Sequence, residues 1–212
     1  MLDFITIREN TEFVLNEKKS KFIANLIKIS SQEEAEEVIK KHKKQYHDAR
    51  HNCIAYRVLE NEQIIEKSSD DGEPSGTAGA PMLNILQKNN LCNVLIIVTR
   101  YFGGILLGTG GLVRAYSDAL NGAIEEADKV TQTIGYIVEC TVEYNQFEKF
   151  QYYCKTKQID IINAEYLDNI VCKISIEEGK KYKLLQDINE KNINIINYNI
   201  FNKTLVTINK MN

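Results

Sequence analysis

Residues 68–118 of this chain of 212 residues read SSDDGEPSGTAGAPMLNILQKNNLCNVLIIVTRYFGGILLGTGGLVRAYSD. Nine of the eleven glycines lie between Gly72 and Gly122, together with both prolines, Pro74 and Pro81. Glycine loses more backbone entropy on folding than other residues, so a fold concentrates it where a left-handed turn or the close approach of a ligand or second backbone demands it. We therefore expect the functional surface of the protein in this stretch.

The composition is that of a globular protein without a large surplus of charge. Hydrophobic residues make up 43% of the chain, charged residues make up 26%, and the net charge is −3. Basic and acidic side chains number 11 and 12 in residues 1–66, 5 and 7 in residues 67–135, and 10 and 10 in residues 136–212. This balance argues against binding nucleic acid mainly through its phosphates, although a local patch could still contact RNA. No DNA binding is expected.

Three features predict a cytoplasmic protein that does not enter a membrane. The five cysteines are scattered and contain no CxxC pair, a pattern typical of reduced thiols in the cytoplasm. The start of the chain lacks a basic region followed by an apolar one, so no secretion signal is expected. The longest apolar run, Val94–Val98, is far shorter than the roughly 20 residues that span a bilayer.

The first 130 residues predict strands and helices on both sides of the glycine-rich stretch. Ser31 and Glu34 form a capping box that starts a helix. Residues 93–99 contain the continuous apolar run Val94–Val98 and are rich in β-branched side chains, as in a central strand covered on both faces. The remaining elements are strands at 4–8, 11–16, 20–30, 52–59 and 63–67, a short helix at 82–87, and a helix from Leu112 to about Asp128.

From residue 136 onward the pattern predicts a second domain. Its elements are a strand at 136–143, a helix at 145–158, strands at 159–166 and 170–176, a helix at 180–191, and one or two strands within 193–208. The order βαββαβ is that of the ferredoxin-like fold. We therefore predict an α+β protein of two two-layer domains, an N-terminal βα sandwich at 1–130 and a ferredoxin-like domain at 136–212, with the boundary at about 129–135.

Three carboxylates stand within four residues of the glycine-rich stretch, at Asp70, Asp71 and Glu73. The hydroxyls of Ser75 and Thr77 follow directly. Oxygen ligands of this kind suit Mg²⁺, and carboxylates also receive the cationic groups of a binding partner. The residue types therefore allow either a metal site or a recognition surface.

Two structural alternatives explain the same acidic loop. In one, the loop is a solvated surface segment in which Gly72, Pro74 and Gly76 set the turns. In the other, the carboxylates pair inside the protein with Arg100 or Arg114 and fix two loops together. Clustered carboxylates do not decide among these alternatives and the functional ones.

Arg100, Tyr101 and Phe102 stand at the carboxyl end of the predicted buried strand and are followed by Gly103 and Gly104. In open α/β sheets, ligand sites lie at the carboxyl ends of strands. An arginine and two aromatic rings beside bare backbone suit stacking on a base or contact with an acidic peptide. In the structural alternative, one ring fills the core and the other covers the glycine turn.

Gly108, Gly110 and Gly111 lie where a helix is expected to open. The free N–H groups and the positive dipole end of such a helix suit a phosphate or a carboxylate. No Gly-Lys-Ser/Thr sequence follows, so the stretch is not a P-loop. A tight connection between strand and helix explains the same glycines.

His47, His51 and Cys53 raise the question of a zinc site. Their spacing argues against one, because only His51 and Cys53 face the same way on a strand and no fourth ligand is evident. His42 ends a lysine-rich helix and is expected to be solvated. The chain has no GxSxG, HExxH or CxxC motif, so we expect neither nucleophilic catalysis nor a cofactor.

Three segments, taken in order, resemble the IMPACT family in its bacterial, YigZ-like form. They are HDARHNCIAY at 47–56, DDGEPSGTAGAP at 70–81 and NVLIIVTRYFGGILLGTGGLVRAY at 93–116. The resemblance is strong over residues 20–130, and bacterial members carry a ferredoxin-like C-terminal domain. It implies an N-terminal domain like domain IV of the translocation elongation factor and like the GHMP kinases, although the phosphate-loop motif of those kinases is absent here.

The same resemblance implies a role and a patch of residues. Eukaryotic relatives regulate translation by binding the ribosome-associated activator of a starvation-sensing kinase. Bacteria lack that pathway, so the partner is not carried over. The family's suspected binding patch corresponds here to Asp71, Gly72, Glu73, Pro74, Ser75, Gly76, Thr77, Arg100, Tyr101, Phe102, Gly103, Gly104 and Arg114.

Together these observations predict a non-enzymatic binding protein that contacts the translation machinery, through RNA or a ribosome-associated protein. One alternative is a Mg²⁺-dependent enzyme that binds a nucleotide or phosphate with residues 108–111 and the metal with the acidic loop. Another is a purely architectural motif in which acids and arginines lock loops together. The binding hypothesis requires the 70–77 and 100–104 segments to converge on one solvent-facing surface.

Overall fold

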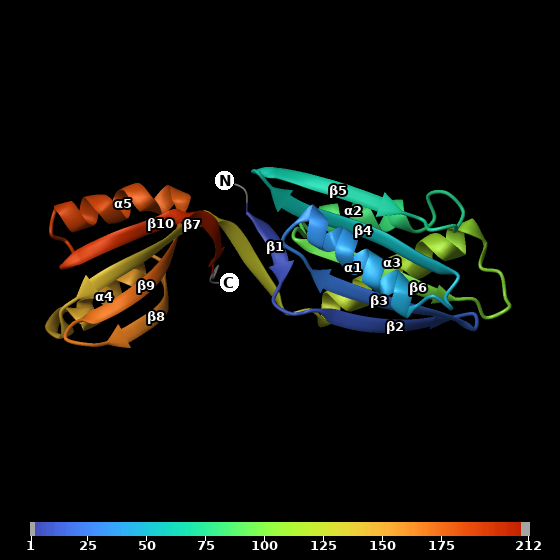
Figure 1. Cartoon of the computed structure of the whole chain (residues 1–212), viewed down its shortest axis with the longest axis horizontal. Helices are drawn as coiled ribbons and strands as arrows, with labels where there is room; N and C mark the ends of the chain where they lie inside the picture. The colour runs from blue at the N-terminus through green and yellow to red at the C-terminus, as the bar shows by residue number, and fades with distance from the viewer. Residues whose placement is uncertain (1–2, 209–212) are drawn as a thin grey trace. The chain divides into compact units, whose positions relative to one another are not determined.

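The computed structural model describes residues 3–208, which form two compact units (Figure 1). One unit comprises residues 5–129, and the other is built mainly from the chain after residue 129. The elements in chain order are β1 (Phe4–Ile7), β2 (Thr11–Glu17), β3 (Ser20–Lys28), α1 (Gln32–Gln45), β4 (His51–Glu60), β5 (Gln63–Ser69), α2 (Gly79–Lys88), β6 (Val94–Tyr101), α3 (Gly108–Glu126), β7 (Lys129–Val142), α4 (Tyr144–Thr156), β8 (Asp160–Tyr166), β9 (Ile170–Glu177), α5 (Glu178–Asn189) and β10 (Asn197–Ile208). Within residues 3–208, no helix is both long and apolar enough to cross a bilayer.

Strand β6 lies at the centre of the N-terminal sheet, in which neighbouring strands are antiparallel in the order β2-β3-β6-β4-β5. Residues 94–100 are all buried, as expected for a continuously apolar strand covered on both faces. The register places Thr99 opposite Asn52 and Arg100 opposite His51. Polar residues of β4 and β6 therefore meet at one end of the sheet.

Helices cover both faces of this sheet (Figure 1). α1 packs through Ala35 and Ile39 on a cluster that includes Tyr56, whereas α2 and α3 supply Met82 and Tyr116 to the cluster on the opposite face. The α+β class with two domains is confirmed. The N-terminal unit nevertheless has one helical layer more than the two-layer expectation, because successive residues of its inner strands bury side chains on opposite faces.

Helix α1 begins at the expected cap. The Ser31 hydroxyl accepts a hydrogen bond from the N–H of Glu34 at 3.0 Å. The carboxylate of Glu34 accepts from the N–H of Ser30, at 2.7 Å, where a reciprocal capping box would use that of Ser31. The first bond satisfies an N–H group that the first turn of the helix leaves without a partner, and the second holds the residue before the cap.

The C-terminal unit has the predicted βαββαβ order. β9 lies between β7 and β8, and β10 pairs with β7, so the strands are arranged β10-β7-β9-β8 and each neighbouring pair is antiparallel. This is the strand order of the ferredoxin-like fold. Alternate residues of β7 and β9, among them Cys140 and Cys172, pack with α4 residues such as Phe150 to form the core.

Three element boundaries differ from expectation. α2 begins at Gly79 and not at residue 82, because Pro81 as third residue falls in the first turn, where an N–H is not needed. α3 begins at Gly108 and not at Leu112, so the glycines form its first turn. Residues 129–135, which contain the point where the two units divide, form the first half of β7 and not a linker, because four of the seven are β-branched.

Candidate functional site

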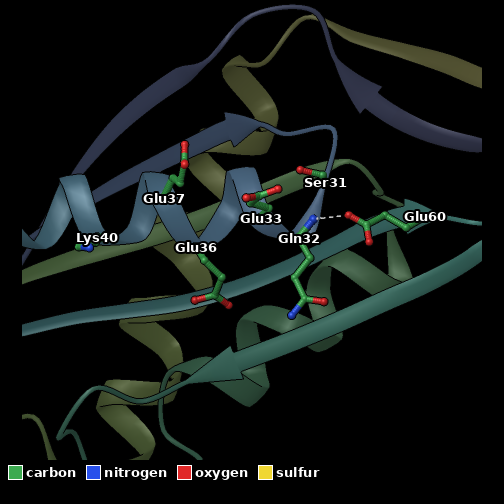
Figure 2. Close-up of a pocket in the computed structure, with 7 residues that line it drawn as sticks. All are labelled: Ser31, Gln32, Glu33, Glu36, Glu37, Lys40 and Glu60. Carbon is green, nitrogen blue, oxygen red and sulfur yellow. Dashed lines mark hydrogen bonds between the residues drawn. The ribbon is translucent and has the colours of Figure 1, made fainter.

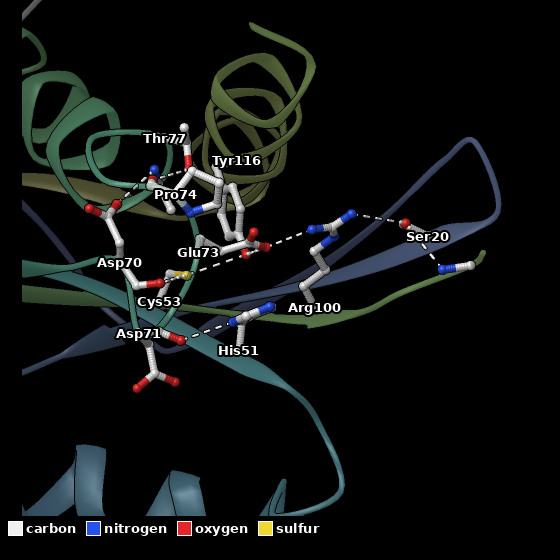
Figure 3. A network of polar contacts seen from close by, with 12 residues as sticks. Ser20, His51, Cys53, Asp70, Asp71, Glu73, Pro74, Thr77, Arg100 and Tyr116 are labelled. Atoms are coloured by element: carbon white, nitrogen blue, oxygen red, sulfur yellow. Dashed lines mark hydrogen bonds and ion pairs between the residues drawn. The ribbon is translucent and has the colours of Figure 1, made fainter. Parts of the chain in front are cut away.

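Loops from distant parts of the chain meet at one end of the N-terminal sheet (Figure 3). The acidic loop, defined as residues 70–78, connects β5 to α2. Beside it lie His51 and Cys53 from the start of β4, Arg100 from the end of β6, and Tyr116 from α3. Their side chains form one connected network of polar contacts.

Asp70 closes the acidic loop on itself. Its carboxylate accepts hydrogen bonds from the N–H groups of Gly76, Ala78 and Gly79 at 2.8, 2.9 and 2.8 Å. Burial alone would raise the pKa of Asp70, but these three donors outweigh it and hold the pKa below its usual value. Asp70 therefore caps the start of α2 and keeps the loop in one conformation.

Asp71 joins the acidic loop to α1 and β4. Its carboxylate accepts the N–H of Asn52 at 2.7 Å and forms an ion pair with Lys43 of α1. Its backbone is left-handed, with a φ of 44°. Nδ1 of His51 lies 2.9 Å from the Asp71 carbonyl oxygen, which can only accept, so this nitrogen carries the proton.

Glu73 and Arg100 form a buried ion pair that joins the two predicted loops. Nη1 of Arg100 lies 2.7 Å from Oε1 of Glu73, and the two side chains are 7% and 3% exposed. The hydroxyl of Tyr116 donates to the same carboxylate oxygen at 2.9 Å. Among the alternatives that the sequence left open, the internal pairing of an acid with an arginine therefore applies to Glu73.

Aromatic rings enclose the Arg100 guanidinium. The ring centroids of Phe22 and Phe102 lie 5.4 and 5.5 Å from its central carbon, within the range of cation–π attraction. Nη2 lies 3.5 Å from the hydroxyl of Ser20, and the buried Nε has no hydrogen-bond partner among the described residues. One predicted ring, Phe102, therefore covers the arginine, while the Tyr101 hydroxyl donates to Asp48 at 3.0 Å.

The two predicted loops converge, but their charged members face inward. Arg114 is exposed and makes no hydrogen bond or ion pair with the acidic loop in the described part of the chain, so its pairing with that loop is not formed. Apart from Arg114, the exposed members are mostly small or apolar. Of the predicted site residues, Glu73, Thr77 and Arg100 are buried, Asp70, Asp71, Tyr101, Gly103 and Gly111 are half-buried, and Gly72, Pro74, Ser75, Gly76, Phe102, Gly104, Gly108, Gly110 and Arg114 are exposed.

Two glycines among the predicted site residues have different environments. Gly103 is pressed against the β2–β3 turn, because a Cβ at this position would lie 2.0 Å from the carbonyl group of Lys19. Gly110, in the first turn of α3, has a φ outside the left-handed region, and apart from the neighbouring helix backbone no atom of the protein would come within 4 Å of a Cβ there. Packing explains the glycine at 103, whereas nothing within the chain explains the glycine at 110.

A second polar chain, not foreseen from the sequence, lies on the α1 face of the sheet. Nε2 of His42 lies 2.8 Å from the Thr99 hydroxyl, which donates to the Asn52 side chain at 2.7 Å. His42 is buried, which corrects the expectation that it is solvated, and burial lowers its pKa to about 4. The sequence contained one signal for this burial: His42 follows the buried Ala35 by seven residues, which places both on one helical face.

Cys53 is a buried thiol within the network. Its Sγ donates to the Asp70 carbonyl oxygen at 2.9 Å and lies 3.3 Å from the Tyr116 hydroxyl. Burial raises the pKa of Cys53 to about 12 and also raises that of Tyr116. Within residues 3–208, no three His, Cys, Asp or Glu side chains are grouped so that they could hold a metal ion.

A hollow of about 620 Å³ lies at the start of α1 and contains none of the predicted site residues (Figure 2). Two of its carboxylates are already engaged: Glu60 accepts the N–H of Gln32, and Glu36 forms an ion pair with Lys67. Its lining residues are Ser31, Gln32, Glu33, Glu36, Glu37, Lys40 and Glu60. The hollow is acidic, open and separate from the converged loops.

Comparisons with known proteins cover both units. Residues 18–124 match the family described as the Impact N-terminal domain, and residues 140–191 match a domain of unknown function, DUF1949. The chain is 39% identical to the IMPACT family member YvyE of Bacillus subtilis over 82% of its own length and 80% of that protein. It is 34% identical to the IMPACT family member YigZ of Escherichia coli over 77% and 80% of the two lengths. A crystal structure of a hypothetical protein matches the whole chain at a TM-score of 0.60 and 28% identity, and the match covers all of that chain too.

Proposed function

Since this chain belongs to the IMPACT family, we propose that it is a non-enzymatic binding protein that acts on translation by contacting RNA or a ribosome-associated protein. The family resemblance supports this role, because its eukaryotic members are translational regulators. We further propose that the binding surface is the exposed rim of the converged loops, formed by Gly76, Gly104, Gly108 and Gly110. A cytoplasmic location is part of the proposal, and it is supported by the five cysteines, all of which are free thiols.

The observation that carries the proposal is exposed glycine backbone that lies above a buried ion pair. Apart from the neighbouring backbone, a Cβ added at Gly76, Gly104, Gly108 or Gly110 would meet no protein atom within 4 Å. Beneath this rim, the Glu73–Arg100 pair holds the two loops in one arrangement. Exposed backbone on a fixed base lets a second molecule approach closely, and little conformational entropy is lost when it binds.

The enzymatic alternative receives less support from the site. The carboxylates of Asp70, Asp71 and Glu73 all accept hydrogen bonds from, or form ion pairs with, other groups of the chain. A Mg²⁺ ion prefers carboxylate oxygens together with several waters, so these bonds would have to be broken before it bound. The geometry therefore favours recognition over metal-dependent catalysis.

Cosedimentation with purified ribosomes at moderate salt tests the proposal. We expect the full chain to sediment with ribosomes, and we expect Gly110→Asp to abolish this. The aspartate would fill the open space at the start of α3, yet it would favour the helix because a carboxylate stabilises a helix N-terminus. The protein would therefore stay folded while its rim was blocked.

Gly179→Asp is the matched control, because Gly179 is an exposed glycine in the first turn of α5 in the other unit. It should sediment like the unaltered protein. The proposal is wrong if the unaltered chain fails to sediment, or if both aspartate variants sediment equally well.

A further inference from the structure

The loop between β6 and α3, here called the 102–107 loop, exposes three large apolar side chains. Phe102 is 48% exposed, Ile105 is 42% exposed and Leu106 is 83% exposed. Single exposed apolar residues are common on protein surfaces, but several that gather in one loop mark a contact surface. Phe102 covers the guanidinium of Arg100, whereas Ile105 and Leu106 have no part in the buried network.

The base of the 102–107 loop is fixed. The N–H of Gly103 donates to the hydroxyl of Ser20 at 3.3 Å, and the backbone of Gly103 packs on that of Lys19. The Phe102 ring lies over the guanidinium of Arg100, which is itself paired with Glu73. The apolar side chains are therefore presented by an anchored loop, which reduces the entropy lost on binding.

Basic side chains outnumber acidic ones around the loop, where three lysines stand near Glu17 of the same hairpin and Asp48, which accepts the Tyr101 hydroxyl. Lys18 and Lys19 are exposed in the β2–β3 turn, which Gly103 contacts, and Lys21 stands opposite Tyr101 in the sheet. Figure 1 shows this turn and the loop at the same end of the N-terminal unit. The first turn of α3 adds its free N–H groups, since it has no acidic residue and no side-chain cap. This local charge contrasts with the net charge of −3 of the whole chain.

From this combination we infer that the 102–107 loop inserts into an apolar pocket of a partner protein whose rim carries carboxylates. The inference rests on the proposed function and names the chemistry of the partner at the same site. The charge of the lysines complements an acidic rim, and the most exposed side chain, Leu106, is aliphatic. Nucleic acids offer no pocket of that kind, because bases in single strands bind proteins mainly by stacking on aromatic rings.

Photocrosslinking tests this inference with the full chain. A benzophenone amino acid replaces Leu106 in one protein and Tyr182 in a control, because Tyr182 is 81% exposed on α5 in the other unit. Both are irradiated with purified ribosomes supplemented with a ribosome-free translation extract, and the adducts are analysed for protein and for RNA. We expect position 106, and not position 182, to give a protein adduct whose crosslinked peptide is rich in Asp and Glu.

Charge-reversal and truncation variants sharpen the test. Lys18→Glu combined with Lys19→Glu should lower the adduct yield from position 106 about tenfold, since two favourable charge contacts become repulsive. Lys40→Glu with Lys41→Glu, a pair of equal charge exposed on α1, should leave the yield unchanged. In a binding assay with the crosslinked protein once purified, Leu106→Ser should weaken binding tenfold or more, because a buried leucine side chain contributes that much.

The outcomes separate this inference from the proposed function. Adducts to RNA, adducts to a protein segment without carboxylates, or equal yields at 106 and 182 overturn the acidic-pocket inference, even if the chain sediments with ribosomes. Failure of sedimentation overturns the proposed function instead. Leu106→Ser removes a solvent-exposed side chain, so an unchanged thermal unfolding temperature excludes misfolding as the cause of lost binding.

Discussion

Among individual side chains, the Glu73–Arg100 pair has the largest structural consequence. It connects two segments that are 27 residues apart, and both side chains are almost completely buried. Two charges removed from water are tolerated only when they are paired and hydrogen-bonded, and Tyr116 supplies a further bond to Glu73. The pair therefore fixes the relative position of the loops that carry the exposed rim.

We predict that Glu73→Gln lowers the free energy of unfolding by about 3 kcal/mol or more, because it leaves the charge of Arg100 buried without a counter-ion. Urea denaturation followed by circular dichroism measures the change. The control is Lys67→Ala, which breaks the exposed Lys67–Glu36 ion pair and should change the same free energy by less than about 1 kcal/mol. A loss below about 1 kcal/mol for Glu73→Gln would show that the pair does not hold the loops together.

His42 makes stability depend on pH. Its pKa falls from 6.5 to about 4 on burial, so the unfolded chain takes up a proton at a pH at which the folded chain does not. The contribution of neutral His42 to the free energy of unfolding is therefore complete above pH 6.5 and is lost as the pH falls toward 4. The shift corresponds to about 3 kcal/mol at most.

The prediction is a fall in the free energy of unfolding between pH 6.5 and 4.5, measured by urea titrations at each pH. His42→Gln should flatten this part of the profile, because glutamine does not titrate. His47→Gln should not, since His47 is exposed. An unchanged slope in the His42 variant would contradict the assignment.

Among the elements, the β2–β3 turn, the 102–107 loop and the first turn of α3 act together. The turn holds Lys18 and Lys19 at φ values of 44° and 66°, and it touches the loop through Gly103. The loop in turn leads directly into α3. Gly103 is therefore held by a close backbone contact within this group of segments, whereas a Cβ on Gly110, in the first turn of α3, would extend into open space.

Alanine substitutions at two glycines should consequently have opposite effects. Gly103→Ala places a methyl group on the Lys19 carbonyl and should destabilise the protein by more than about 1 kcal/mol. Gly110→Ala meets nothing and should raise stability by about 0.5–1 kcal/mol, since alanine favours a helix more than glycine does. Thermal unfolding of both variants measures this. Equal effects would show that the close approach at Gly103 is not maintained in solution.

At the level of the whole chain, the two compact units have separate cores. The clusters around Tyr116 and Tyr56 belong to the N-terminal unit, and the cluster around Phe150 belongs to the C-terminal unit. Separate hydrophobic cores can open independently, so local stability can differ between them.

We therefore predict that Glu73→Gln accelerates amide hydrogen exchange in β4 and β6 and leaves exchange in β9 and α4 unchanged. The reason is that the broken ion pair lies wholly within residues 5–129. Mass spectrometry of peptides from both units measures the rates. Equal acceleration in both units would mean that the chain unfolds as one cooperative block.

The sequence by itself determined the elements and their grouping. Alternation of apolar residues, the Ser31 cap and the continuous apolar run of β6 act over a few residues, so strands, helices and the βαββαβ order could be predicted from them. The glycine-rich stretch also predicted where the candidate surface lies. Local signals were weaker at glycines and prolines, which is why α2 and α3 begin three and four residues before the expected positions.

Only the tertiary structure decided which of these residues face solvent. The sequence offered Arg100 and Arg114 equally as partners of the acidic loop, and folding buried the first and left the second exposed. It likewise gave no partner for His42, which meets Thr99 from 57 residues away. Whether a charged side chain is paired in the interior or exposed to solvent depends on which strands become neighbours and which helices cover them. That is a property of the packed sheet and its layers, so no local pattern encodes it.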